Sequence, residues 1–270
     1  MLAELRAARS HAVGVYALRR ADWMIMARVL SDECRLVELA TQQEVRAAVR
    51  VGAILTLMVG AVDSKGYSLA PLVVDIRADG SRIPIAAVCR LDSKDANNLV
   101  GLIHAGVDGI LLSGSDDFAS SLRRRVRECE RNSVAKVVYR RVESELPTNL
   151  RALARFAADA GGEDFSVERA AQVIGIDRKT LLNRMRTIGR LEPRVFINRV
   201  RLTVAVGLIE RTARPTETIA HELGFASAAA FRNMLARYSG RKTGDIRGGR
   251  MFEEMLDELV LEIRTSRHTQ

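Results

Sequence analysis

The stretch that decides the fold runs from residue 166 to residue 247 and carries one pattern twice. Ser166-Val-Glu-Arg-Ala-Ala-Gln-Val-Ile-Gly-Ile-Asp177 leads into Arg178-Lys-Thr-Leu-Leu-Asn-Arg-Met-Arg186. Thr216-Glu-Thr-Ile-Ala-His-Glu-Leu-Gly-Phe-Ala-Ser227 leads into Ala228-Ala-Ala-Phe-Arg-Asn-Met-Leu-Ala-Arg237. Each copy predicts a short helix, a turn with one glycine, a capping residue and a second helix. This is the helix-turn-helix pattern, whose second helix enters a DNA major groove, and two copies are more specific than one.

A single helix is predicted between the two copies. Pro193 opens it, since a proline at the first helical position lacks only an N–H that would have no partner there, and it ends near Thr212, before Pro215. Its apolar positions are Val195, Phe196, Val200, Leu202, Val206 and Ile209. About 20 residues at about 1.5 Å each give roughly 30 Å, and successive major-groove faces of B-DNA are about 34–36 Å apart. The helix therefore has about the length that sets two recognition helices into adjacent grooves; a helical bundle without a DNA role is the alternative.

These residues resemble the AraC-type transcription regulators, a family with two helix-turn-helix units on a long central helix. The second copy carries the family signature at Ile219, Ala220, Gly224, Phe225, Phe231, Arg237, Gly240 and Arg247. Three positions depart from it: Gly244 replaces the usual proline, Ala230 replaces an aromatic residue and Asn233 replaces a common arginine. The last departure affects the base preference of this unit rather than its fold. The resemblance implies a sequence-specific, DNA-binding transcription regulator, with the double helix-turn-helix domain at residues 151–250.

The distribution of charge agrees with DNA as a partner. The chain has 42 Lys+Arg and 33 Asp+Glu, for a net charge of +9. Residues 131–250 hold 23 basic and 12 acidic side chains, whereas residues 1–130 hold 17 and 16, and residues 251–270 hold 2 and 5. A basic excess confined to the helix-turn-helix region is the pattern expected for contact with phosphates, although some of these arginines will only face solvent.

Helical spacing divides each second helix into a buried side and an outward side. Leu181, Met185 and Ile188 in the first copy, and Phe231 and Leu235 in the second, are expected in the core. The outward residues, which we expect to contact DNA, are Arg178, Lys179, Leu182, Asn183, Arg186, Ser227, Ala228, Arg232, Asn233 and Ala236. Arginine or lysine suits guanine, asparagine suits adenine, and an exposed leucine can meet a thymine methyl. Because the second helix is less basic and richer in alanine, the first unit is expected to carry more of the base readout.

The first 130 residues predict an α/β fold followed by the all-α region. Apolar strand-like runs alternate with helical segments: Ala12–Leu18, Arg20–Ser31, Arg35–Ala40, Gln43–Val51, Ala53–Val59, Tyr67–Arg77, Ile83–Leu91, Ser93–Ala105, Gly109–Ser113 and Asp116–Glu130. Strands that read as near-continuous apolar runs indicate a parallel sheet covered on both faces. Five such repeats fit a doubly wound, five-stranded parallel sheet.

The later half of this region resembles the receiver domain of response regulators. Ile83-Pro84-Ile85 and Ala105-Gly106-Val-Asp108 match that family's fourth and fifth strands and the helix between them, and Asp63 and Gly66 fit the loop after the third strand. The resemblance implies a receiver-like fold over most of residues 10–128.

The residues that phosphoryl transfer to aspartate requires are missing. In register, the end of the third strand is Met58, the acidic pair falls at about Tyr16–Leu18, the hydroxyl position is Cys89 and the lysine position is Ser113. Asp63 is a weak substitute acceptor, because no carboxylates accompany it to hold Mg²⁺. We therefore expect residues 1–128 to form a pseudo-receiver used for docking, dimerising or sensing.

Two further segments carry apolar faces. Residues 129–150 continue an apolar stripe from Phe118 to Leu146 at helical spacing, which predicts a linker helix that either pairs across a dimer or packs on the first helix-turn-helix. Residues 251–270 predict an acidic amphipathic helix that packs back on the protein or contacts a partner. Its apolar face is Phe252, Met255, Leu256, Leu259, Val260 and Ile263.

The remaining features set limits on class. No apolar run reaches the roughly 18 residues of a membrane span, and there is no signal-peptide or disulfide pattern, so a cytoplasmic protein is expected. Cys34, Cys89 and Cys129 sit in apolar settings, and neither catalytic groups, a metal site nor a cofactor are indicated. Expected partners are double-stranded DNA, a second copy in a homodimer, and RNA polymerase or another regulator. The alternative function is an architectural or adaptor protein with mainly electrostatic DNA affinity and a protein-docking N-terminal domain.

Overall fold

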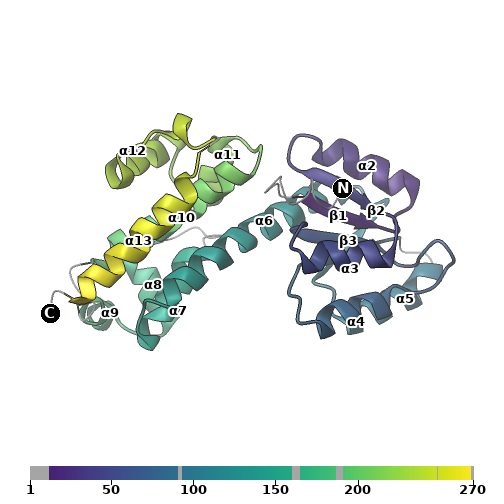
Figure 1. The fold of residues 1–270 in the computed structure, drawn as a ribbon, viewed down its shortest axis with the longest axis horizontal. Coiled ribbons are helices and arrows are strands. Elements are labelled where there is room, and N and C mark those ends of the chain that lie inside the picture. The colour runs from purple at the N-terminus through teal and green to yellow at the C-terminus, as the bar shows by residue number, and fades with distance from the viewer. Residues whose placement is uncertain (1–11, 91–92, 160–164, 187–190, 248, 269–270) are drawn as a thin grey trace. The chain divides into compact units, whose positions relative to one another are not determined.

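The computed structural model describes residues 12–90, 93–159, 165–186, 191–247 and 249–268 (Figure 1). The chain divides into two compact units, Met1–Glu130 and Arg131–Gln270, which are called the N-terminal and C-terminal units below. Each unit is described by itself.

The N-terminal unit contains a five-stranded parallel sheet. Its strands are β1 (Ala12–Tyr16), β2 (Arg35–Leu39), β3 (Thr56–Gly60), β4 (Ile85–Cys89) and β5 (Gly109–Leu112). Its helices are α2 (Arg20–Leu30), α3 (Gln42–Arg50), α4 (Ala70–Ala78), α5 (Ser93–Ala105) and the first part of α6 (Phe118–Glu143). The strand order is β2-β1-β3-β4-β5 with every pair parallel. This is the doubly wound order that receiver domains share with flavodoxin, and it confirms the predicted fold class.

Helices cover both faces of the sheet, as the near-continuous apolar strands predict. One face packs against α3, α4 and α5, and the other packs against α2 and α6. Successive strand residues alternate between the two: Leu57 and Val59 face the first core, and Met58 faces the second. All five residues of β3 are buried, which explains why this strand shows no polar alternation in the sequence.

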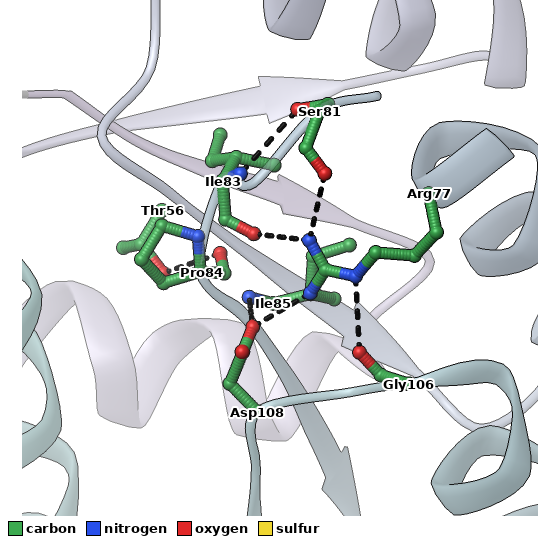
Figure 2. Close-up of polar contacts among 8 residues, drawn as sticks. All are labelled: Thr56, Arg77, Ser81, Ile83, Pro84, Ile85, Gly106 and Asp108. Atoms are coloured by element: carbon green, nitrogen blue, oxygen red, sulfur yellow. Dashed lines mark hydrogen bonds and ion pairs between the residues drawn. The ribbon is translucent and has the colours of Figure 1, made fainter. Parts of the chain in front are cut away.

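Arg77, near the end of α4, connects the turns at the amino-terminal edge of the sheet through hydrogen bonds and an ion pair (Figure 2). Its guanidinium donates to the backbone carbonyls of Gly106 at 3.1 Å, Ser81 at 3.2 Å and Ile83 at 2.7 Å. It also pairs with Asp108 at 2.7 Å, and the same carboxylate oxygen accepts from the first backbone N–H of β4 at 2.7 Å. The Arg77 side chain therefore supplies hydrogen-bond donors to backbone carbonyls in the turn before β4 and in the turn before β5. Without it these carbonyls would lack partners.

At the carboxyl edge of the sheet, the predicted end of the third strand was wrong. β3 ends at Gly60 and not at Met58, which is fully buried within the strand. Gly60 cannot carry a side chain there, because a Cβ would lie 2.1 Å from the carbonyl oxygen of Ala17. Asp63 lies beyond the strand, and its Oδ1 accepts from the backbone N–H groups of Lys65 and Tyr67 at 2.9 Å each. Its carboxylate is thus used to hold its own loop.

The structure also places a carboxylate at this edge that the sequence did not single out. Asp22, in the first turn of α2, is buried; it pairs with Arg19 at 2.8 Å and accepts a hydrogen bond from Ser113 after β5. Ser113 therefore occupies the expected lysine position and contacts a carboxylate there. Across the described ranges, no group of three or more His, Cys, Asp or Glu side chains is placed to hold a metal ion.

The three cysteines lie in the N-terminal unit and are not joined in disulfides. Cys89 and Cys129 are buried and Cys34 is half-buried. Burial, with the nearby Glu130 and Glu33 carboxylates, raises the pKa of Cys34 to about 12. A thiol with so high a pKa is hardly ionised at neutral pH, so it reacts slowly.

The described part of the C-terminal unit has helices as its only regular elements. After the second part of α6 come η1 (Thr148–Leu150), α7 (Arg151–Ala158), α8 (Val167–Ile174), α9 (Arg178–Arg186), α10 (Pro193–Arg211), α11 (Thr216–Glu222), α12 (Ala228–Ser239), η2 (Thr243–Asp245) and α13 (Met251–His268). Helix α10 lies at the centre and contacts α7, α9, α11, α12 and α13. Every residue from Val200 to Ile209 is buried. The unit is therefore built around this one helix.

The later part of the α6 stripe and the apolar face of α13 are both buried inside the C-terminal unit, whereas Phe118, Leu122 and Val126 of the stripe pack on the sheet. Val134, Val138 and Val142 of α6 are fully buried. A Cβ at Gly207 of α10 would lie 2.7 Å from both Val134 and Phe252, so α6 and α13 meet α10 where the glycine gives them room. This part of the stripe lies against α10 and α13 of the same chain, whereas the prediction within the chain was packing on the first helix-turn-helix; pairing across a dimer stays a prediction. None of the described helices combines the length and apolar character needed to cross a membrane.

Candidate nucleic-acid interface

The first helix-turn-helix, called the first motif (residues 166–186), is shaped by two caps and one glycine. Ser166 caps α8, accepting from the backbone N–H of Arg169 at 3.1 Å. Gly175 ends α8 with φ of 78°, a left-handed conformation that favours glycine. Asp177 precedes α9 and accepts from Thr180 twice, from the backbone N–H at 2.9 Å and the hydroxyl at 2.6 Å. These contacts fix the angle at which α9 leaves the turn.

The second helix-turn-helix, called the second motif (residues 216–240), repeats this plan with different side chains. Gly224 in the turn has φ of 69°. Ser227 caps α12, accepting from the backbone N–H of Ala230 at 3.0 Å. The Phe225 ring packs edge-on against Phe231 of α12, with centroids 5.2 Å apart. An aromatic contact between turn and recognition helix thus stabilises this motif.

The predicted outward residues are mostly exposed. The exposed residues of α9 are Arg178, Lys179, Asn183 and Arg186, and those of the second motif are Ser227, Arg232, Asn233 and Ala236. Two predicted residues, Leu182 and Ala228, are half-buried. Leu181, Met185, Phe231 and Leu235 lie in the core, as predicted. Ile188, also predicted for the core, lies outside the described residues. The side of each second helix that faces away from the core therefore carries the residues proposed for DNA.

Arg178, at the start of α9, pairs with Glu168 of α8 at 2.8 Å. Both side chains are more than half exposed, at 61% and 63%. An exposed pair of this kind is screened by solvent and contributes little to stability. The guanidinium of Arg178 can therefore exchange this carboxylate for a phosphate or a base edge at small cost.

Three arginines of the C-terminal unit make contacts that were not predicted from the sequence. Arg214, after α10, is 1% exposed and pairs with Glu222 of α11. Arg247 donates to the carbonyl oxygen of Thr212 at 3.3 Å and to that of Arg214. Together they hold the loop from α10 to α11 and so set where the second motif begins. The family signature had singled out Arg247 without indicating its contacts, and an arginine such as Arg214 usually faces solvent.

The third is Arg201, at the middle of α10. It is 6% exposed, and its guanidinium carbon lies 4.4 Å from the ring centroid of Phe165 and 3.9 Å from that of Phe225. Burial lowers the pKa of Arg201 to about 10, which leaves the side chain charged at neutral pH. The aromatic faces supply the attraction that water would otherwise provide.

Comparison with known proteins agrees with this geometry. Residues 170–248 match a family model described as a helix-turn-helix domain. A comparison with curated proteins finds no match. Among solved structures, the chain is similar to a response regulator from Thermotoga maritima, at 18% sequence identity and a TM-score of 0.36, over 44% of this chain and 97% of that chain.

The helix-turn-helix match indicates a DNA-binding transcription regulator. The strand order of the N-terminal unit is the one found in receiver domains and also in flavodoxin. The chain thus carries an AraC-type double helix-turn-helix DNA-binding domain after a receiver-like α/β domain.

Proposed function

We propose that this protein is a sequence-specific transcription regulator that binds double-stranded DNA through α9 and α12 together. The observation that carries the proposal is that both motifs expose the outward side of their second helix while packing on one shared helix, α10. The 19 residues of α10 span about 28 Å at about 1.5 Å per residue. That length is compatible with two recognition helices in successive major grooves on one side of the duplex.

The two recognition helices would contribute unequally. Helix α9 exposes Arg178, Lys179, Asn183 and Arg186, which are side chains that can form paired hydrogen bonds with guanine or adenine. The half-buried Leu182 and Ala228 would contact thymine methyls or sugars. The second motif offers Arg232 and Asn233 as base-contacting groups, while Ser227 and Ala236 would lie against the backbone and groove floor.

The N-terminal unit would act without a phosphorelay, as a domain for dimerisation or for receiving a partner such as RNA polymerase or another regulator. Support comes from its carboxyl edge, where β3 ends at Gly60 and Ser113 stands at the lysine position. Linking two DNA-binding domains through a dimer would raise DNA affinity by effective concentration.

The decisive experiment selects bound sites from a random DNA library with the full-length chain and then maps protection on the selected site. Each protomer should protect two patches about 10–10.5 base pairs apart, centre to centre. Discrimination against random DNA should reach about 10³-fold or more. A footprint in one groove segment would leave only one motif engaged. Much weaker discrimination would instead favour the alternative, an architectural or adaptor protein with mainly electrostatic DNA affinity.

A second experiment addresses the N-terminal unit. Incubation of the full chain with acetyl phosphate and Mg²⁺ should leave mass, oligomeric state and DNA affinity unchanged, because the carboxylates that hold Mg²⁺ in a working receiver are missing. A base-labile mass gain of one phosphoryl group, lost in Asp63→Asn, would contradict this and indicate a rearranged but working receiver.

A further inference from the structure

We propose that Arg201 is a positioning residue that fixes the orientation of the two recognition helices relative to each other, and so sets the spacing between the two DNA elements that the protein accepts. The inference rests on the proposed function. Its basis is the contact of the Arg201 guanidinium with two aromatic rings, since its carbon lies over the Phe165 ring at 4.4 Å and over the Phe225 ring at 3.9 Å from the centroids.

One ring lies at the entrance of the first motif and the other in the turn of the second. Phe165 directly precedes Ser166, the cap of α8, and also contacts Phe156 of α7 with ring centroids 6.0 Å apart. Phe225 follows the turn glycine of the second motif and contacts Phe231 of α12. One guanidinium on α10 therefore touches the entrance of the first motif and the turn of the second, so neither can rotate about α10 without disturbing the stack.

The chemistry of this contact suits a side chain that orients the two rings better than one that adds to the stability of the fold. Arg201 is 6% exposed, and its Nε has no hydrogen-bond partner among the described residues. Burying a charged group in this way costs free energy that a well-packed apolar side chain would not cost. A planar guanidinium, however, can stack on two aromatic faces at once and define both ring planes, which neither lysine nor an aliphatic side chain can do.

A matched control lies on the same helix. Arg211 of α10 also stacks on an aromatic ring, that of Phe252, at 4.2 Å, and pairs with Glu253 at 3.5 Å. Both of these partners are on α13, outside the two motifs. Removing Arg211 thus removes the same kind of interaction from the same helix without releasing either motif.

The experiment measures how binding depends on spacing. The two elements found by library selection are placed in duplexes whose centre-to-centre distance changes in steps of one base pair. Each step turns one element by about 34–36° around the duplex, since B-DNA has about 10–10.5 base pairs per turn. The full-length wild type is compared with Arg201→Met, Arg201→Lys and Arg211→Met, and a duplex with one element reports on each motif alone.

Wild type should prefer its best spacing over a one-base-pair change by about tenfold, whereas Arg201→Met should reduce this preference at least about threefold. Arg201→Lys should behave like Arg201→Met because it keeps the charge and loses the planar stack. Arg211→Met should keep the wild-type preference. Affinity for a single element should remain within about twofold in all variants, a readout that general loss of stability would change.

Two results would overturn the inference. An unchanged spacing preference in Arg201→Met, with wild type showing a clear optimum, would overturn it alone and leave two-element binding intact. Absence of any spacing optimum in wild type would overturn the proposed function as well. If thermal melting shows that Arg201→Met no longer folds, Phe165→Leu is tested in its place. It removes one ring at a half-buried position and keeps the guanidinium, and it should relax the spacing preference.

Discussion

The two helix-turn-helix motifs share one backbone plan and differ in the chemistry placed on it. Helix α9 exposes Arg178, Lys179 and Arg186, whereas the exposed side of α12 includes alanine. The second motif is instead held by an aromatic contact in its turn and by two arginines at its entrance, the buried Arg214 and the exposed Arg247. A recognition helix with few base-contacting groups gains from a fixed position, because its contribution depends on fit to the groove.

The comparison suggests a division of work. We infer that the first motif supplies most of the base recognition and that the second fixes register and adds contacts with the backbone. Arg201 joins the two, since its guanidinium contacts a ring from each. Equal contributions of the two motifs to sequence discrimination would contradict this inference. Exchanging a single side chain between the motifs would test which residues cause the difference.

The largest losses of stability and DNA discrimination should follow from truncating a buried core side chain in one motif at a time. Leu181 and Phe231 are fully buried in the first and second motif. Truncating a buried leucine or phenylalanine to alanine costs about 2–5 and about 3–5 kcal/mol respectively. Leu181→Ala should therefore abolish sequence discrimination, while Phe231→Ala should shorten the footprint to one patch and keep part of the discrimination. Denaturant unfolding and footprinting check this; equal losses of discrimination would break the comparison.

The elements that local signals specify could be predicted from the sequence. Pro193 begins α10, Gly175 and Gly224 occupy left-handed turn positions, and Ser227 caps α12. Each depends on the chemistry of a few neighbouring residues, so one sequence suffices.

Features that depend on distant partners could not be predicted. Arg201 is buried because the rings of Phe165 and Phe225 reach it from other parts of the chain, and nothing near residue 201 signals them. The end of β3 was misplaced for a similar reason. It was placed at Met58 in register with the receiver family, whereas the strand continues to Gly60.

A middle-sized effect should separate the outward residues of the two motifs. Arg178→Ala or Arg186→Ala should weaken specific binding by about 1–3 kcal/mol if the side chain reads a base. Arg232→Ala should cost less than about 1 kcal/mol, in the range of a phosphate or rim contact. Fluorescence anisotropy with the selected site measures both.

Glu168→Gln provides the control for the first motif. It removes the carboxylate that pairs with Arg178 at 2.8 Å, so it should leave affinity equal or slightly higher. Wild-type affinity in both Arg178→Ala and Arg186→Ala would show that this side of α9 does not meet DNA.

The smallest effect concerns pH and the two caps. Hydrogen bonds from Thr180, first from its hydroxyl and then from its backbone N–H, hold the pKa of Asp177 below its ordinary value. A carboxyl with a depressed folded-state pKa stabilises the fold above its unfolded pKa, of about 4, and this contribution disappears as pH falls through the folded value. Ser227 caps the second motif without a titrating group, so only the first motif should lose its cap in acid.

Exchanging the caps tests this directly. Asp177→Ser should remove part of the loss of melting temperature between about pH 6 and pH 3, because the stabilisation by the carboxylate is absent at both. Ser227→Asp should add a similar loss to the second motif, since an aspartate there can accept from the same backbone N–H that Ser227 now caps at 3.0 Å. All other carboxylates are the same in the three proteins, so the differences report on the caps. Identical pH profiles for wild type and Asp177→Ser would show that the Asp177 cap contributes nothing through its charge, and the two motifs would then differ only in their outward side chains and their anchoring.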